Sequence, residues 1–407
     1  MRVLCIALSC SPFGGSEDAV GWNTPLAMAR GGMEVTVIAR AEQKHDMDIW
    51  RVENPNETMP RFIYVPVPKI LDAKPFRGQF QSLRLNPWLR RVHRVIKAMI
   101  AQGECFDVIH QITPVEFRAV MRPVVHSGIN VIGPLGGAGE PCEELRPYLE
   151  SGMAEAIRLF FNRCTRSSHR RSARLASYDL RYFANRETHG YLLDHGAAIN
   201  DCLMTDVGCL DADLQNAPQC MEHEGLHLLF IGRLVPRKGA RLLLEALSLM
   251  KPDAAYELRI YGDGTERKFL EQFVEDNHLN KISFIGHVEH SETEKAYQWA
   301  DVLVFPSIRD TTGVVLLESL AHGLPVIAFR QMGASLVLDD SCAQLVNPHE
   351  GMRGFARAIS RWVDHPEMVP STCIVRQRAA CFTWEHKVDI FMHDYSVALS
   401  AREGAMQ

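Results

Sequence analysis

Two short apolar runs in the second half of the chain constrain its fold more than any other feature. Residues 302–305 and 325–329 are each typical of a buried strand, and a helix is predicted over 314–322 between them. The polar turn 310–313 joins the first strand to that helix. A strand, a loop, a helix and a second strand in this order predict a parallel α/β sheet, because parallel strands need a crossover connection.

The polar turn has the composition of an anion site. The backbone N–H groups of Thr312, Gly313 and Val314 are predicted to lie at the helix N-terminus, where the helix dipole favours a phosphate. Asp310 precedes these donors, and Glu318 follows more than two turns up the helix. Two carboxylates so placed can bind hydroxylated groups at both ends of one ligand, with its phosphate between them.

Length, composition and charge limit the class of protein. The chain has 407 residues, of which 46% are hydrophobic, and a net charge of −5, which favours two globular domains and does not suggest a nucleic-acid partner. Eleven cysteines without close Cys-x-x-Cys pairs are typical of reduced thiols rather than disulfides or zinc. Residues 1–8 predict a first strand, not a signal peptide, and no stretch is apolar enough to span a bilayer. We therefore expect a cytoplasmic protein.

Strands and helices alternate along both halves of the chain. Strands are predicted at 3–8, 34–39, 62–67, 106–112, from 130, at 203–207, 227–233, from 258, and at 282–288, and helices at 17–30, 87–100, 187–195, 240–249, 266–277, 292–300 and 384–399. This order predicts two domains, each with a mostly parallel sheet covered by helices. The stretch 210–224 has mixed polarity and no sustained period, so we expect the interdomain linker there.

Several loops at predicted strand ends are candidate binding segments, because ligands bind parallel sheets at the carboxyl ends of the strands. Gly14 and Gly15 lie in the first such loop, and Gly136 and Gly137 in a later one. Glycine allows backbone N–H groups to approach a ligand closely, although a flexible turn explains such loops equally well. His110 lies near the end of another strand, where it either reaches a cleft or is a satisfied core residue.

The loop after the strand at 227–233 carries two cations. Arg233 comes directly off the strand, and Lys238 precedes Gly239, which opens the next helix. Two positive charges so placed can neutralise a diphosphate from one side.

These motifs resemble the retaining, nucleotide-sugar-dependent glycosyltransferases of family 4. Their signature is an acid, seven residues and a Glu, followed by a small-x-Gly-x-Pro-Val turn, and it reads here Asp310, Glu318 and the turn 321–326. The Gly-Arg-Leu and Lys-Gly pattern over 232–239 adds to the match. The resemblance implies the GT-B fold, α/β with two Rossmann-like domains facing each other across a cleft. We expect an N-terminal acceptor-side domain over 1–209, to which a C-terminal helix at 385–407 returns, and a donor-binding domain over 210–384.

The resemblance also implies a role for each candidate residue. Arg233 and Lys238 would bind the donor's phosphates, Asp310 the sugar hydroxyls and Glu318 the ribose. His110 would orient the sugar near its anomeric carbon.

Backbone groups would complete the site. Gly262 and Asp263, in the turn after the strand that begins at 258, belong to the same donor site, and Gly286 would serve the nucleobase. Gly14 and Gly15 would approach the donor phosphates, with Thr312, Gly313 and Val314 on the opposite loop. Gly136 and Gly137 would lie on the acceptor side, in a loop that resembles a bacterial branch acting on polysaccharide precursors.

The expected reaction is transfer of a sugar from a UDP- or GDP-sugar to a glycan or polyprenyl-diphosphate-linked acceptor, in bacterial surface or exopolysaccharide synthesis. The loops predicted to line the cleft carry no Asp-x-Asp metal pair, so we expect a hexosyltransferase that needs no metal or other cofactor. Family resemblance implies retention at the anomeric carbon. A GT-B epimerase or phosphorylase shares the architecture, and a non-catalytic nucleotide-sugar sensor is the alternative of a different class. A dehydrogenase is disfavoured, because neither half has a Gly-x-Gly-x-x-Gly with a following acid.

Two basic stretches, 74–97 and 158–174, contain aromatic residues and no acids. They predict either peripheral contact with the inner face of the plasma membrane or solvated helix faces with aromatic anchors in the core.

Overall fold

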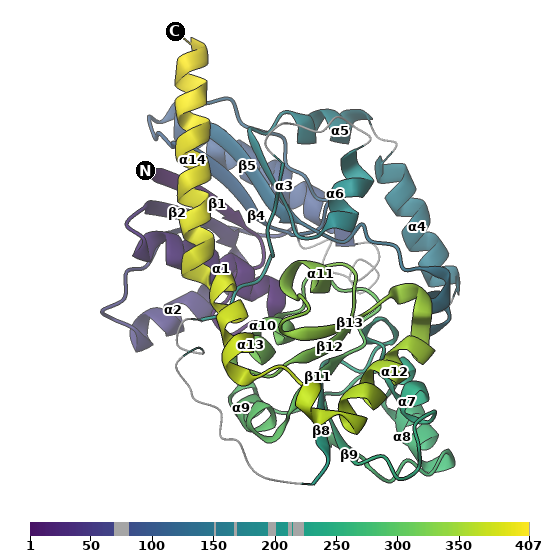
Figure 1. Ribbon diagram of the computed structural model, residues 1–407. Helices are drawn as coiled ribbons and strands as arrows, with labels where there is room; N and C mark the ends of the chain where they lie inside the picture. The colour runs from purple at the N-terminus through teal and green to yellow at the C-terminus, as the bar shows by residue number, and fades with distance from the viewer. Residues whose placement is uncertain are drawn as a thin grey trace. The chain divides into compact units, whose positions relative to one another are not determined.

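The computed structural model describes residues 1–68, 81–149, 152–166, 169–193, 201–210, 214 and 224–406. The chain divides into two compact units, and each is built around one parallel sheet, as the sequence predicts (Figure 1). Unit 1 contains Met1–Ala138, Ile157–Gly208 and Trp384–Gln407, and unit 2 contains Gly139–Ala156 and Cys209–Thr383. The segment Gly139–Ala156 therefore packs with unit 2, whereas the sequence analysis assigns it to the first domain.

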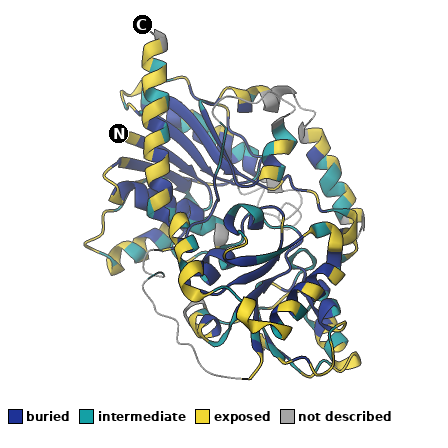
Figure 2. Ribbon diagram, in the orientation of Figure 1, coloured by how far each residue is buried: buried dark blue, intermediate teal, exposed yellow. Residues whose placement is uncertain are grey.

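Unit 1 is a Rossmann-like α/β domain. Its elements are β1 (Arg2–Ala7), α1 (Ser16–Arg30), β2 (Glu34–Arg40), α2 (Lys44–Glu53), β3 (Arg61–Val65), α3 (Gln81–Ala101), β4 (Val108–Thr113), β5 (Ile129–Leu135), α4 (Gly152–Arg166, which begins in unit 2), α5 (His169–Ala176), β6 (Leu180–Phe183), α6 (Arg186–Leu193), β7 (Asp201–Leu203) and α14 (Trp384–Met406). The strand order is β3-β2-β1-β4-β5-β6-β7, and all neighbours pair in parallel. The central strands β1, β4 and β5 are buried along nearly their whole length (Figure 2), as expected for a parallel sheet that is covered on both faces.

Unit 2 repeats this plan. Its elements are η4 (Glu143–Tyr148), β8 (Leu226–Ile231), η6 (Pro236–Lys238), α7 (Ala240–Leu247), β9 (Tyr256–Tyr261), α8 (Arg267–Asp276), β10 (Ile282–Gly286), α9 (His290–Trp299), β11 (Val302–Phe305), α10 (Val314–Ala321), β12 (Val326–Phe329), α11 (Ala334–Val337), β13 (Ala343–Val346), η7 (Pro348–Glu350), α12 (Gly351–Asp364) and α13 (Thr372–Ala379). The parallel strands follow the order β10-β9-β8-β11-β12-β13. The strand order thus reverses between β8 and β11, which makes the C-terminal ends of these two strands a switch point.

The secondary structure differs from the prediction in several places. The strand expected at 203–207 is β7, Asp201–Leu203, so its predicted position is wrong by several residues. The helices α2 and α12 were not predicted at all, although α12 buries Phe355 and Trp362 in the core of unit 2. The predicted linker 210–224 lies outside the described residues except for its ends and Leu214.

The C-terminal helix α14 is built into the core of unit 1. It packs against α1 and β5 (Figure 1), and its residues Phe391 and Tyr395 are fully buried. The Tyr395 hydroxyl lies 2.6 Å from Nδ1 of His110 on β4, and the Tyr182 hydroxyl donates to Asp394 at 2.8 Å. Buried polar groups that are paired in this way fix the helix at one position along its axis.

Loss of the Tyr395 hydroxyl should destabilise unit 1. Tyr395→Phe leaves a buried imidazole nitrogen of His110 without its partner, which costs about 1–3 kcal/mol. The free energy of unfolding, followed in urea by the fluorescence change of unit 1, measures the loss. Ser396→Ala is the control on the same helix, because Ser396 is exposed and its hydroxyl donates to the Met392 carbonyl within that helix, so a change within about 0.5 kcal/mol is expected. Equal effects of the two substitutions would contradict the pairing.

Candidate functional site

The loops after β8 and β11 meet at the switch point of unit 2. The Arg237 carbonyl accepts the N–H of Ile308 at 2.9 Å and that of Arg309 at 3.3 Å. Gly239 has a φ of 74°, and a Cβ at this residue would lie 2.2 Å from the carbonyl oxygen of Pro306. Glycine is therefore required here both for the backbone conformation and for the close approach of the two loops.

This meeting of loops brings two predicted site residues together. Lys238 Nζ and Asp310 Oδ2 form an ion pair, and their side chains are only 17% and 18% exposed. Arg237 adds a second cation 3.8 Å from the other oxygen of Asp310, and Ser307 Oγ lies 3.5 Å from Asp310. The sequence analysis missed Arg237, although it is adjacent to Lys238 in the same cationic loop. Lys238 Nζ also lies 5.9 Å from the centre of the Phe305 ring.

The N-terminus of α10 borders the same carboxylate. Gly313, which precedes the helix, has a φ of 90°, and a Cβ there would lie 2.8 Å from the Phe305 ring and 3.6 Å from Asp310 Oδ2. Thr312 is buried, and among the described residues its Oγ1 has no hydrogen-bond partner. Val314 begins the helix. A helix N-terminus next to Lys238 and Arg237 provides positive electrostatic potential on both sides of one loop junction.

Glu318 is held in place by a tyrosine from another helix. The hydroxyl of Tyr297, on α9, donates to Glu318 Oε2 at 2.7 Å. Tyr297 is 2% exposed, and its ring stacks on His322 with 4.6 Å between ring centres. The half-buried carboxylate therefore has a fixed orientation on α10. The sequence gives no sign of this contact, because Tyr297 lies 21 residues before Glu318 in a helix of mixed polarity.

The remaining donor-side candidates lie at the ends of β8, β9 and β10. Gly262 donates its N–H to the Gly286 carbonyl at 2.7 Å, and a Cβ on Gly262 would lie 2.0 Å from the Gly232 carbonyl. The carboxylate of Asp263 accepts the N–H of Gly264 at 2.6 Å, so it caps its own turn. Arg233 is exposed and lies two residues after the end of β8. All of these residues share the C-terminal edge of the sheet with Lys238 and Asp310, because the strands are parallel.

His110 is a core residue of unit 1, so the structure contradicts its predicted contact with the sugar. It is fully buried, and both ring nitrogens are paired, Nδ1 with Tyr395 and Nε2 with the Gly133 carbonyl 2.8 Å away. A carbonyl oxygen can only accept, so Nε2 carries the proton and Nδ1 accepts from Tyr395. Burial lowers the pKa of His110 to about 3, and the ring is neutral at physiological pH.

The glycine loops of unit 1 are used partly by the fold itself. The N–H of Gly136 donates to the Val115 carbonyl at 2.8 Å, and its own carbonyl accepts from Phe117 at 3.1 Å, so its backbone is not available to an acceptor. Gly137 is exposed with a φ of 92°. Gly14 and Gly15 precede α1, and a Cβ on Gly14 would collide with the Asp18 side chain at 2.4 Å.

A carboxylate that the sequence analysis missed lies beside these glycines. Glu17, in the first turn of α1, accepts the N–H of Val115 at 2.9 Å. Burial and the nearby carboxylates of Glu116, Asp18 and Asp206 raise the pKa of Glu17 to about 7, against the opposing effect of the Val115 bond. The strand order of unit 1 reverses between β1 and β4, and Glu17 and Val115 follow those two strands. The switch point of unit 1 thus contains an acid that titrates near neutral pH.

The basic stretches divide between core and surface. On α3, Trp88 and Leu89 are buried in the core of unit 1, which supports the interpretation as a solvated face with core anchors. On α4, by contrast, Phe160 is 63% exposed and Arg163 is exposed. Residues 74–80 and 167–168 lie outside the described residues. In the part of the chain that the structure describes, no helix has the length and apolar character needed to cross a membrane.

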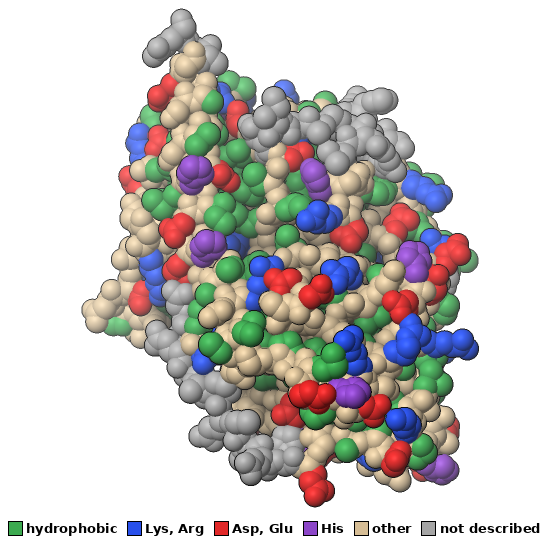
Figure 3. All heavy atoms as spheres, in the orientation of Figure 1, with side chains coloured by type: hydrophobic (Ala, Val, Ile, Leu, Met, Phe, Trp, Pro, Cys, Tyr) green, Lys and Arg blue, Asp and Glu red, His purple; other side chains and the backbone are tan. Residues whose placement is uncertain are grey.

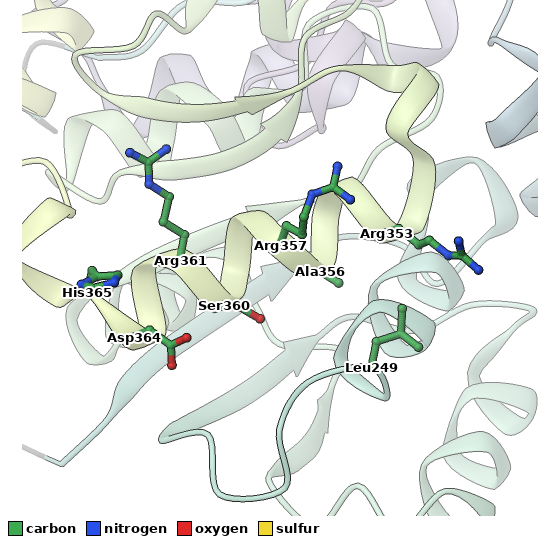
Figure 4. A pocket seen from close by; sticks show the side chains of 8 residues that line it. All are labelled: Leu249, Arg353, Ala356, Arg357, Ser360, Arg361, Asp364 and His365. Carbon is green, nitrogen blue, oxygen red and sulfur yellow. The ribbon is translucent and has the colours of Figure 1, made fainter.

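The surface charge of the molecule and a pocket along α12 are both distinct from the junction at Lys238 and Asp310. Acidic and basic side chains are interspersed over the face shown in Figure 3, without a single large basic field. A pocket on unit 2 lies along α12 and is lined by Leu249, Arg353, Ala356, Arg357, Ser360, Arg361, Asp364 and His365 (Figure 4). None of these residues belongs to the loops after β8 and β11, so the pocket is separate from Lys238 and Asp310.

The comparisons with known proteins agree with this geometry. Residues 225–365 match the family described as Glycosyl transferases group 1. An uncharacterized glycosyltransferase of Methanocaldococcus jannaschii is 31% identical over 140 residues, which is 33% of this chain and 36% of that protein. The phosphatidyl-myo-inositol mannosyltransferase of Mycolicibacterium smegmatis is 26% identical over 81% of this chain and 80% of that protein. The chain spans less than half the length of several other curated relatives that it matches, among them D-inositol 3-phosphate glycosyltransferases.

Solved structures of low identity share the fold. The sucrose-phosphate synthase of Thermosynechococcus elongatus has a TM-score of 0.66 at 19% identity, with 98% of this chain and 99% of that chain covered. Anabaena HepE in complex with UDP and glucose has a TM-score of 0.56 at 15% identity, with 97% and 99% covered. The two Rossmann-like domains of this chain are therefore those of GT-B glycosyltransferases in fold.

The burial of His110 predicts a pH dependence of stability. Its pKa is about 3 when folded and 6.5 in the unfolded chain, so as the pH falls below 6.5 the unfolded state takes up a proton that the folded state does not. Between pH 7 and pH 5 this group alone should remove about 2 kcal/mol of the free energy of unfolding. His110→Gln keeps a donor and an acceptor, and its stability should fall less over this range. Urea unfolding of both proteins at the two pH values measures the difference, in which the other titrating groups cancel. Parallel pH profiles would show that the imidazole is accessible to protons.

Proposed function

We propose that this chain is a retaining glycosyltransferase that transfers a sugar from a nucleotide-sugar donor to a hydroxyl group of a glycan or lipid-linked acceptor. The observation that carries the proposal is the junction of Lys238, Arg237 and Asp310 at the switch point of unit 2, beside the N-terminus of α10. The match of residues 225–365 to Glycosyl transferases group 1 covers this junction. HepE, a neighbour in fold, was solved with UDP and glucose, which supports a nucleotide-sugar donor.

The junction suits a leaving diphosphate. Negative charge develops on the diphosphate as the bond between its oxygen and the anomeric carbon breaks, and fixed positive charge there lowers the barrier. Lys238, Arg237 and the N–H groups at Gly313 supply that charge from unit 2, with Arg233 further along the same edge. In this proposal they perform the role of a divalent cation, so the reaction proceeds without a metal.

Retention follows if the acceptor attacks from the face that the diphosphate leaves. The acceptor oxygen forms the new bond to the anomeric carbon, the bond to the diphosphate oxygen breaks, and the acceptor's proton passes to that departing oxygen. The products are a nucleoside diphosphate and the glycoside, and no enzyme group is consumed. Asp310 would hold hydroxyl groups of the sugar while its ring becomes oxocarbenium-like.

Glu318 would bind the ribose of the donor. Its carboxylate is fixed by Tyr297, so it can accept hydrogen bonds from two neighbouring hydroxyl groups without losing rotamer entropy on binding. Gly286 lies at the end of β10, where its backbone would contact the nucleobase, and Gly262 and Asp263 would belong to the same donor site.

The acceptor and its location are also part of the proposal. A polyprenyl-diphosphate-linked acceptor of bacterial polysaccharide synthesis would require contact with the cytoplasmic face of the membrane, for which the exposed Phe160 and Arg163 of α4 are suited. Transfer of radiolabel from UDP- and GDP-sugars to glycans and to lipid acceptors in anionic vesicles tests the acceptor class. Binding of a donor without transfer to any acceptor would favour a nucleotide-sugar sensor instead, and failure to sediment with the vesicles would exclude the membrane contact.

Removal of the Lys238 charge should impair both donor binding and transfer. Lys238→Ala is expected to lower kcat by about 10²–10³, because a charge that stabilises the leaving group is lost. Calorimetry with UDP and GDP, in the absence of metal, measures the binding part. Lys251→Ala is the matched control, since Lys251 also pairs with an aspartate of unit 2 but is 72% exposed, and its activity should not change. Wild-type binding and turnover by Lys238→Ala would falsify the phosphate role of this loop.

Loss of the Tyr297 hydroxyl should weaken ribose recognition specifically. Tyr297→Phe frees the Glu318 carboxylate to adopt other rotamers, and we expect about tenfold weaker binding of the preferred nucleoside diphosphate. The same substitution should hardly affect the 2′- and 3′-deoxy analogues, because they lack the hydroxyl groups that Glu318 binds. Tyr256→Phe, on β9, is the control. If the ribose and deoxyribose ligands lose equal amounts of affinity, Glu318 contacts a part of the ligand other than the ribose hydroxyl groups.

A further inference from the structure

Three metal-ligating side chains of unit 2 meet outside the proposed donor site. Cys142 precedes η4, Glu144 lies within it, and His349 lies in η7. Their Sγ, carboxylate oxygen and imidazole nitrogen all lie within 4.8 Å of one another. Among the described residues, no other three His, Cys, Asp or Glu side chains lie so near one another. Sequence spacing gave no hint of the group, because Glu144 and His349 are 205 residues apart.

The distances fit a small tetrahedral cation. Zinc bonds of about 2.0–2.3 Å at tetrahedral angles place neighbouring nitrogen and oxygen ligands about 3.4 Å apart and put sulfur about 3.6 Å from either. His349 Nδ1 lies 3.2 Å from Glu144 Oε2 already, and the sulfur lies within 4.8 Å of both. Glu144 and His349 are 42% and 70% exposed, so a rotamer change suffices to close the remaining gap.

The donor set selects the metal. A thiolate is a soft ligand that hard cations such as Mg²⁺ and Ca²⁺ avoid, whereas a thiolate, an imidazole and a carboxylate together suit Zn²⁺. On binding, the thiol would lose its proton to solvent, so that Cys142 and Glu144 both bind the cation as anions.

The ligands belong to a framework that holds them without a metal. Leu145, next to Glu144, is fully buried in the core of unit 2, and its N–H donates to the Cys142 carbonyl at 3.2 Å. In η7 the Asn347 side chain accepts the N–H of His349 at 3.1 Å. Both ligand-bearing turns are therefore fixed in the backbone, and only side chains need to move.

We propose that Cys142, Glu144 and His349 bind one Zn²⁺ ion, with solvent as the fourth ligand, and that this ion fastens the segment Gly139–Ala156 to unit 2. This segment reaches unit 2 from between two parts of unit 1 in the sequence. At its other end, Glu155 pairs with Arg309 at 2.6 Å, directly beside Asp310. A metal at Cys142 thus stiffens a segment that contacts the loop after β11. The proposal does not depend on glycosyl transfer.

Cobalt absorption and zinc competition test this site on the full-length protein after treatment with a chelator. Co²⁺ should produce a thiolate-to-metal charge-transfer band at one equivalent, and Zn²⁺ should abolish it. Cys142→Ser should remove the band, and His349→Ala should weaken Zn²⁺ binding at least 100-fold against a chromophoric chelator. Hydrogen exchange of residues 143–148 should slow when Zn²⁺ is added to the wild type.

Matched variants separate this site from other thiols and imidazoles. His365 and Glu367 form a pair with the same 3.2 Å separation but without a cysteine, and His365 lies at the end of α12 (Figure 4). Neither His365→Ala nor Cys373→Ser, which removes another exposed thiol, should alter the band or the affinity. A band that survives in Cys142→Ser, or that is lost equally in Cys373→Ser, overturns the site. If one Zn²⁺ binds but hydrogen exchange at residues 143–148 does not slow, the claim that the ion fastens the segment to unit 2 is overturned.

Discussion

The reversal of strand order between β8 and β11 is the constraint on which the proposed chemistry of unit 2 depends. The loops that follow parallel strands all lie at one edge of the sheet. At the reversal, no crossover helix separates the loop after β8 from the loop after β11, so these two loops meet. Gly239 lets the first loop pass against the Pro306 carbonyl, and the backbone bonds to Arg237 hold the two loops together. Lys238 and Asp310 are in contact because of this backbone arrangement. Their attraction by itself is weak evidence for stability, because both side chains are largely buried and the cost of desolvating two charges offsets the Coulomb gain.

The sequence was sufficient where a feature is local. The apolar runs of β8 and β11, the glycine before α10, and Lys238 and Asp310 as separate candidates each lie in a short segment with recognisable spacing, and β11 and α10 form the predicted strand-loop-helix unit. The contact between Lys238 and Asp310, which are 72 residues apart, was not predicted. His110 was misjudged because its burial depends on Tyr395, which lies 285 residues later in α14. Tyr297 escaped notice for the same reason, since only the packing of α9 against α10 makes it a partner of Glu318. Contacts between elements distant in sequence leave no periodic signal that a single sequence can reveal.

Unit 1 uses buried polar groups to select one position for α14. Besides the contacts of Tyr395, the helix brings Lys387 into the core, where its Nζ donates to the Asp206 carbonyl at 2.7 Å and burial lowers its pKa to about 7. A hydrophobic residue at this position would avoid the cost of desolvating an amine. An apolar helix face alone, however, could slide along the sheet by one turn, whereas each of these polar groups finds its partner at only one position. The polar contacts therefore specify the docking of α14 more than they stabilise it.

The ion pair of Lys238 and Asp310 also bears on how a donor would enter unit 2. Without a ligand, the charge of Lys238 is already neutralised by the Asp310 carboxylate. A diphosphate would therefore bind Lys238 only by displacing this carboxylate or by sharing the lysine with it. Arg237, 3.8 Å from Asp310, can retain that carboxylate while Lys238 turns to the phosphate. One oxygen of Asp310 would then have no cation beside it, and this oxygen would accept hydrogen bonds from hydroxyl groups of the sugar. Because Asp is one methylene shorter than the Glu common in the resembling family, its reach is limited to hydroxyl groups close to the diphosphate. The same exchange of partners would bind the diphosphate and the sugar of the donor in one step.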